Sequence, residues 1–221
     1  MSQQTDFILV TDHCQSLSLP TRLKMELQHL IIKIPVAGAL GIDPAKVVDL
    51  FHRWVAQQFI PGVLLIDVAE LLHVPDGPGV IAVGHEADFA LDHTGGVCGA
   101  LYRRKTILGG TNQERIAQAI ASAAQTALRL QEAFPGTLKF SRTEFDFIIN
   151  DRGIAPNAGA TYASALPEIE TSLRAVLGHG NFKFTRHDRD LRQRFGVTIH
   201  ASQPFDLETL AAAGLPEVAA R

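Results

Sequence analysis

Residues 63–104 read VLLIDVAELLHVPDGPGVIAVGHEADFALDHTGGVCGALYRR, and this stretch decides the fold class. It consists of short runs of strand-forming residues separated by residues that favour turns. The predicted strands cover residues 63–69, 79–83, 89–91 and 98–104. Turns are predicted at residues 74–78 and at Gly95-Gly96, which lie between the strands. Consecutive strands joined by such short turns indicate antiparallel pairing.

The segment before this stretch predicts a strand followed by a helix. Residues 30–36 alternate between apolar and more polar side chains, which is typical of a strand. Asp43 then provides a helix N-cap and Pro44 the first helical position, and apolar residues follow at helical spacing to about residue 59.

The strongest helix signal lies at about residues 112–133. Apolar residues recur there at intervals of three and four, Thr111 and Glu114 have the spacing of a capping box, and Pro135-Gly136 ends the helix. Its alanines favour close packing on a sheet.

The remaining segments repeat the order strand, helix, strand, strand. A strand is predicted at residues 145–149 and a helix at 166–176, and the last two strands begin near Phe182 and Phe195. The same order occurs at about 29–84. Two interpretations remain open, because a structural duplication and a chance recurrence of a common unit explain the pattern equally well.

Together these elements predict an α+β protein with a mainly antiparallel sheet, helices on one face and ferredoxin-like packing. Such sheets often form homodimers through an uncovered face. The predicted parts are an N-terminal arm (1–24), an α+β domain (25–202, with halves 25–110 and 137–202 joined by a helix at 111–134) and a C-terminal tail (203–221).

The composition restricts the class of function. With 46% hydrophobic residues in 221, the chain can form a full core. Twenty basic and 23 acidic side chains argue against a broad nucleic-acid surface. Two cysteines do not make a disulfide framework, and neither a targeting segment nor a membrane span is recognisable. We therefore expect a soluble cytoplasmic protein that binds neither nucleic acid nor membrane.

A histidine- and acid-rich segment suggests a catalytic site at Asp67, His73, His85 and Glu86. Two imidazoles and a carboxylate would suit a divalent metal such as Zn²⁺, Fe²⁺ or Mn²⁺, and they could also transfer protons. The spacing is not specific, however. The alternative is an exposed His73 at a strand end and a hydrogen-bonded core His85. Asp67 requires a partner if it is buried, and this partner is either His85, which would then be oriented for general base work, or a backbone amide at a strand end.

The residues that follow are expected to be structural. Asp88, Asp92 and His93 approach a Gly-Gly turn, and such residues usually form a solvated strand end.

A second candidate site binds an anion at Arg103, Arg104, Gly110 and Thr111. Free amides and the positive end of the helix dipole attract phosphate or carboxylate groups, and the arginines would add charge. In the alternative interpretation the glycines form a loop, Thr111 is only a cap and the arginines are solvated.

Two classes of function follow. The favoured one is a ferredoxin-like binding or scaffold module that acts as a homo-oligomer and binds a small anionic ligand or a partner protein. The other is a metal-assisted or acid–base enzyme that uses Asp67, His73, His85 and Glu86. The sequence does not identify the substrate, the reaction or the metal.

Overall fold

The structure is a computed structural model that describes residues 25–38, 41–178, 180–187 and 190–213. These residues form one eight-stranded sheet in the order β2-β3-β4-β5-β1-β6-β8-β7, in which all neighbouring strands are antiparallel. The strands are β1 (Leu30–Pro35), β2 (Leu65–Leu71), β3 (Gly79–Gly84), β4 (Ala87–Asp92), β5 (Gly99–Arg104), β6 (Glu144–Ile149), β7 (Phe182–Arg186) and β8 (Phe195–Ala201). The predicted strands and their antiparallel pairing are thus confirmed.

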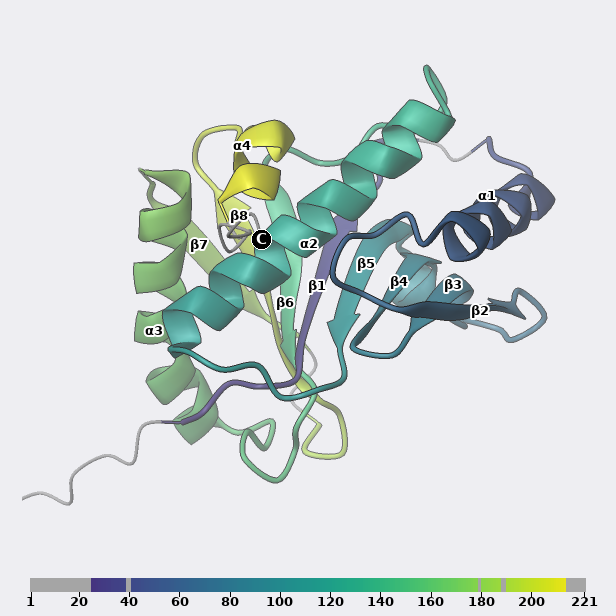
Figure 1. Cartoon of the computed structure of the whole chain (residues 1–221). Helices are drawn as coiled ribbons and strands as arrows, with labels where there is room; N and C mark the ends of the chain where they lie inside the picture. The colour runs from purple at the N-terminus through teal and green to yellow at the C-terminus, as the bar shows by residue number, and fades with distance from the viewer. Residues whose placement is uncertain (1–24, 39–40, 179, 188–189, 214–221) are drawn as a thin grey trace, which may run out of the picture.

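The helices lie over one face of the sheet, and the longest of them crosses its middle (Figure 1). The described helices are α1 (Pro44–Gln57), α2 (Asn112–Ala133), α3 (Gly159–Leu177), α4 (Leu207–Ala212) and the short 3₁₀ turn η1 (Thr94–Gly96). The α+β class with helices on one face is therefore confirmed.

The predicted helix starts are also present. Asp43 accepts a hydrogen bond from the Ala45 amide at 3.0 Å, and Pro44 begins α1. At the start of α2, Thr111 and Glu114 form the reciprocal capping box, which satisfies two amides that the helix itself leaves unpaired.

The middle of the sheet joins the two halves of the chain through the antiparallel pair β1 and β6. On one side, β6, β8 and β7 are direct neighbours, whereas the β4–β5 hairpin lies between β1 and the pair β3 and β2 on the other side. A ferredoxin-like arrangement is not confirmed, because all eight strands form a single wide sheet. The duplication stays a prediction.

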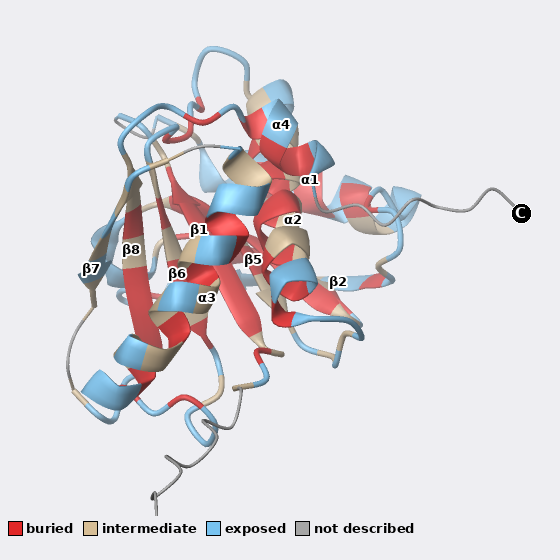
Figure 2. Cartoon of the chain, turned by 90° about the vertical axis from the view of Figure 1, so that its left-hand side faces the viewer, coloured by how far each residue is buried: buried red, intermediate tan, exposed pale blue. Residues whose placement is uncertain are grey.

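The core lies between the sheet and the helices, where Figure 2 shows the buried residues concentrated. It contains Phe147 and Val197 from the sheet and Trp54 from α1. The C-terminal segment also contributes, because Leu207 and Leu210 of α4 are buried and α4 contacts α2. The prediction of a loose tail from residue 203 is therefore wrong up to Ala213, since burial of these leucines stabilises the segment.

The remaining predictions concern the N-terminal arm, the end of the C-terminal tail and the lack of a membrane-spanning helix. The N-terminal arm (1–24) and residues 214–221 of the predicted tail lie outside the described residues. Within the described ranges, no helix combines the length and the apolar character that a membrane crossing requires.

Candidate functional site

Each central strand presents alternate residues to the two faces of the sheet. On β1, Ile32 packs in the helix-covered core and its neighbours Ile31 and Lys33 point to the opposite, open face. The same alternation gives the open face four acidic residues and one basic residue from the neighbouring strands: Asp88 and Asp92 on β4, Arg103 on β5, and Glu144 and Asp146 on β6.

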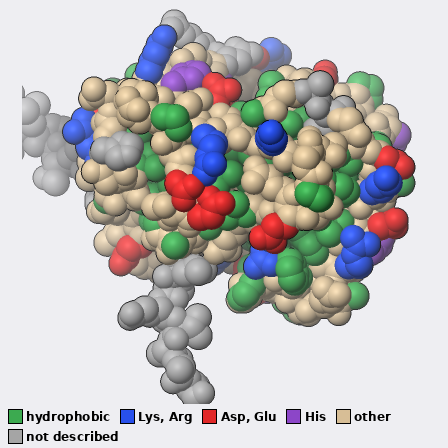
Figure 3. Space-filling model, turned by 90° about the horizontal axis from the view of Figure 1, so that it is seen from above, with side chains coloured by type: hydrophobic (Ala, Val, Ile, Leu, Met, Phe, Trp, Pro, Cys, Tyr) green, Lys and Arg blue, Asp and Glu red, His purple; other side chains and the backbone are tan. Residues whose placement is uncertain are grey.

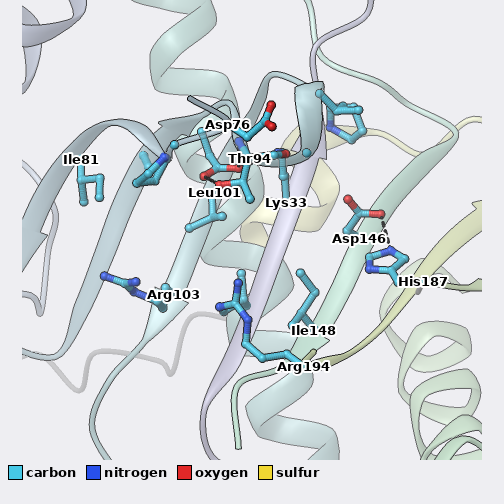
Figure 4. A pocket seen from close by; sticks show the side chains of 18 of the residues that line it. Lys33, Asp76, Ile81, Thr94, Leu101, Arg103, Asp146, Ile148, His187 and Arg194 are labelled. Atoms are coloured by element: carbon cyan, nitrogen blue, oxygen red, sulfur yellow. Dashed lines mark hydrogen bonds and ion pairs between the residues drawn. The ribbon is translucent and has the colours of Figure 1, made fainter. Parts of the chain in front are cut away.

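These residues line a cavity of about 790 Å³ on the open face (Figure 4). Its floor is apolar, with Ile31, Ile148 and Leu101 at the centre. Loops form the walls, because the β2–β3 turn supplies Asp76, η1 supplies Thr94, and the segment between β7 and β8 supplies His187 and Arg194. A cavity with an apolar floor and a few convergent polar groups is typical of a small-molecule site.

The strand register orders the polar groups across this face. Lys33 lies opposite Leu101 on one side and Asp146 on the other, and Asp146 lies opposite Thr198 of β8. Two residues before Lys33 on β1, Ile31 lies between Arg103 of β5 and Ile148 of β6.

Lys33 and Asp92 form a buried ion pair at one end of the cavity. The ammonium Nζ of Lys33, a residue only 4% exposed, lies 2.5 Å from Asp92 Oδ2 and donates a second hydrogen bond to the Thr94 carbonyl at 3.0 Å. The lysine reaches β4 by crossing over Gly99 of β5. A Cβ at Gly99 would lie 3.0 Å from Lys33 Cγ and 2.7 Å from the Ile34 carbonyl, so a glycine at this position keeps the path open.

Asp88 is a second buried carboxylate and receives two cations. Arg103 donates to it from both Nε (3.0 Å) and Nη2, and Lys105 Nζ lies 2.8 Å from its other oxygen. The Gly84 amide donates to Asp88 as well. Two cations on one carboxylate leave this end of the cavity positively charged.

Arg194 adds a third cation at the rim beside this end. Its side chain runs along the open face near Ile148 (Figure 4), and its Nη1 donates to the Asn150 side-chain oxygen at 3.2 Å. The residue as a whole is exposed, but partial burial of the guanidinium lowers its pKa, and the charge of Arg103 lowers that pKa further against a weaker opposite effect of Asp92. No carboxylate forms an ion pair with Arg194 in the part of the chain that the structure describes.

Asp146, His187 and Thr198 form a hydrogen-bonded group on the other side of Lys33. His187 Nε2 lies 3.1 Å from Asp146 Oδ1 and 3.0 Å from the Thr198 hydroxyl, which donates to the same Oδ1 at 2.7 Å. Burial raises the pKa of Asp146, but hydrogen bonds from His187 and Thr198 outweigh it and hold this pKa below its ordinary value. Gly196 makes room for the imidazole, since a Cβ there would lie 2.5 Å from His187 Nδ1.

The structure does not bring the predicted catalytic histidines together. His73 lies in the turn after β2, while His85 and Glu86 form the tight turn between β3 and β4 at the other end of the same hairpin. The seven residues of β2 separate the two ends by roughly 20 Å. Both histidines are exposed, so the predicted convergence of His73 and His85 is wrong.

The two predicted carboxylates accept hydrogen bonds from backbone amides instead. Asp67 is exposed and accepts from the Val68 amide at 2.8 Å, because a bulge between Leu65 and Asp67 breaks the strand alternation that would have buried it. Glu86 accepts from the Leu64 amide at 3.1 Å, and this bond lowers the pKa of Glu86. Among the described residues, no three His, Cys, Asp or Glu side chains are grouped so that they could hold a metal.

Of the predicted anion-binding residues, only Arg103 lines the main cavity. Arg104 donates to the Thr106 carbonyl and lines a smaller hollow beside the cavity. At Gly110 and Thr111 the Glu114 carboxylate itself accepts from the Thr111 amide at 2.6 Å. The protein thus provides its own anion at the start of α2.

Four residues of the cavity escaped the sequence analysis, namely Lys33, Asp146, His187 and Arg194. The first two carried a usable signal, because Lys33 is the one charged residue of an apolar strand and Asp146 lies between two core phenylalanines. Asp88 and Asp92 were expected to be solvated, which is wrong, since they are 1% and 2% exposed and ion-paired. A charge that alternates with core residues on a strand indicates that the other face of the sheet carries polar groups with specific partners.

Seen from above, the charged side chains form small groups of mixed sign on the part of the surface drawn in colour (Figure 3). A scan of protein-family models finds none that matches the chain, and a search of curated protein sequences finds no significant match. The geometry of the open face is therefore the basis for any functional proposal.

Proposed function

We propose that this protein binds small organic anions and that the open face of the sheet is the binding surface. The observation that carries the proposal is Arg194, a cation at the rim of a cavity of about 790 Å³ whose partner is a neutral amide. The charge of Arg103 disfavours the cationic form of Arg194. A bound anion would offset this repulsion and accept hydrogen bonds from the guanidinium.

The apolar floor supports a ligand with a hydrophobic body. The half-buried side chains of Leu101 and Ile148 offer apolar surface beside the cations, and burying ligand surface there contributes roughly 25 cal/mol per Å². A carboxylate, sulfonate or phosphate attached to an apolar body would satisfy both parts of the cavity.

Fluorescence titration with anilinonaphthalene sulfonate tests this proposal, because the probe combines fused aromatic rings with one sulfonate. Arg194→Gln removes a charge-assisted contact, and we expect it to weaken binding at least about 10-fold. Arg53→Gln is the matched control, since it removes one exposed positive charge from α1, on the opposite side of the sheet. Equal affinity of the Arg194→Gln variant and the unaltered protein would overturn the proposal.

Self-association belongs to the same experiment. A second copy of the chain that covered the open face would block the cavity, so light scattering is measured with and without the probe. If the protein forms a homodimer that dissociates when the probe binds, the homodimer uses this face. If it remains a homodimer with the probe bound, the contact lies elsewhere.

The enzymatic alternative has less support from the geometry. Metal-assisted or acid–base catalysis by Asp67, His73, His85 and Glu86 needs these side chains to converge on one substrate. They lie at two ends of a hairpin, and the carboxylates of Asp67 and Glu86 accept hydrogen bonds from backbone amides.

A further inference from the structure

The cavity on the open face is electrically polarised along the strands. At one end, Arg103 and Lys105 pair with the single carboxylate of Asp88, and Arg194 adds a third cation at the rim. The opposite end has the reverse balance, with four acidic residues around the one lysine: Asp76, Asp92, Glu144 and Asp146. A ligand that fills the cavity therefore contacts a cationic end and an anionic end.

Asp146 is the acidic group best placed to contact a ligand. Its Oδ1 accepts from both His187 and Thr198, and Oδ2 has no hydrogen-bond partner among the described residues. Figure 4 shows the carboxylate with one oxygen toward His187 and the other turned away from it. Because the pKa of Asp146 lies below its ordinary value, the carboxylate is charged at neutral pH.

The other acidic residues at this end of the cavity either pair with a basic side chain or are more exposed than Asp146. Asp92 is neutralised by Lys33, and Glu144 lies 3.2 Å from His200 Nδ1. Asp76 is exposed in the β2–β3 turn and lines the mouth of the cavity. Asp146 thus provides an ionised acceptor with a spare oxygen inside the cavity.

We propose that the ligand is dipolar, with its anionic group at Arg103 and Arg194 and a cationic group, such as an ammonium, at Asp146. This inference rests on the proposed function and extends it to the chemical class of the ligand. The register fixes the spacing. Arg103 and Asp146 are two strands and two residues apart, which places their Cα atoms roughly 12 Å from each other.

An ω-amino acid with an alkyl chain has this arrangement of charges. An alkyl chain of medium length spans this distance over the apolar floor. The matched probes are ω-aminocaprylate and caprylate, which differ only in the terminal ammonium. Desolvation of the ammonium disfavours binding of the amino compound unless a carboxylate compensates for it.

The experiment measures displacement of anilinonaphthalene sulfonate by each probe from the full-length protein. We expect ω-aminocaprylate to bind at least about 5-fold more tightly than caprylate, which corresponds to one ion pair in a partly exposed site. Asp146→Asn keeps a side chain that can hydrogen-bond with Thr198 and removes the charge, and it should abolish the preference. Asp49→Asn, an exposed position on α1, is the matched control and should retain it.

The outcomes separate the two proposals. If caprylate displaces the fluorophore and ω-aminocaprylate binds no better, or if Asp146→Asn leaves their ratio unchanged, the dipolar ligand is refuted and the anion site stands. If neither probe displaces the fluorophore, the proposed function fails and the inference fails with it. Should Asp146→Asn not fold, the two probes on the unaltered protein still decide, because equal affinities for ω-aminocaprylate and caprylate refute the dipolar ligand.

Discussion

The two faces of the sheet are built from alternate residues of the same strands, yet they stabilise the protein differently. On the helix-covered face, Ile32, Phe147 and Val197 pack against the helices. The residues two positions before and after each of them, which point to the same face, are all apolar. On the open face, Lys33 and Asp146 depend on specific partners. The comparison teaches that a strand can carry core packing on one side and a polar site on the other, with the pleat keeping them apart.

Among the substitutions that compare the two faces, we expect Lys33→Met to lower the free energy of unfolding the most. Lys33→Met leaves Asp92 buried without its counter-charge, and we expect a loss of about 3–5 kcal/mol in the free energy of unfolding. Urea denaturation measures it. Adding Asp92→Asn should recover at least about half of the loss, because the uncompensated charge disappears.

Lys46→Met provides the control for this prediction, because Lys46 is exposed on α1. It should change stability by less than about 0.5 kcal/mol. An equally small effect of Lys33→Met would mean that the open face does not depend on its ion pairs.

Two adjacent isoleucines of β6 compare the faces directly. Ile149 is 1% exposed on the helix-covered face, whereas Ile148 lines the cavity. Ile149→Ala should cost about 2–5 kcal/mol and Ile148→Ala about half of that or less, since the open cavity already lacks packing atoms on one side. Thermal and urea denaturation give both values, and equal losses would contradict the distinction between a packed and an open face.

The smallest expected effect is on the pH dependence of stability, and it concerns Asp146 on the open face. The pKa of Asp146 in the folded protein lies below its ordinary value of 3.8. Its contribution to stability is therefore present above that ordinary value and is lost as the pH falls through the lower folded value. Asp146→Asn should flatten the decline of stability below about pH 4, as measured by urea midpoints at several pH values.

A steeper acid decline in the Asp146→Asn variant than in the unaltered protein would contradict this assignment. Asp49→Asn should retain the unaltered decline, because Asp49 is exposed on α1.

Local signals in the sequence were sufficient for most elements of the fold. Asp43-Pro44 and the pair Thr111 and Glu114 marked helix starts that the structure contains. Period-two alternation located the strands, and short turns gave the antiparallel pairing. Neighbours distant along the chain were not accessible in this way, because nothing local specifies that β1 lies between β5 and β6.

The candidate site was harder to predict for the same reason. Lys33 of β1 reaches Asp92 of β4 across the intervening strand β5, and Arg103 meets Asp88 only through the β4–β5 register. His73 and His85 looked close because one turn separates them in sequence, but the hairpin holds them at opposite ends. A high density of histidine and acidic residues along the chain therefore located the candidate site less well than a charged residue between core residues of a strand did.

The pairing of β1 with β6 also has a consequence for biosynthesis. β1 leaves the ribosome before β6, so one of its edges stays open until β6 has been translated, and the cavity acquires Arg194 only later still. Nascent chains must therefore hold an unfinished sheet edge between the synthesis of β1 and that of β6, a state that chaperones commonly protect. Ligand affinity can appear only after Arg194 has been translated.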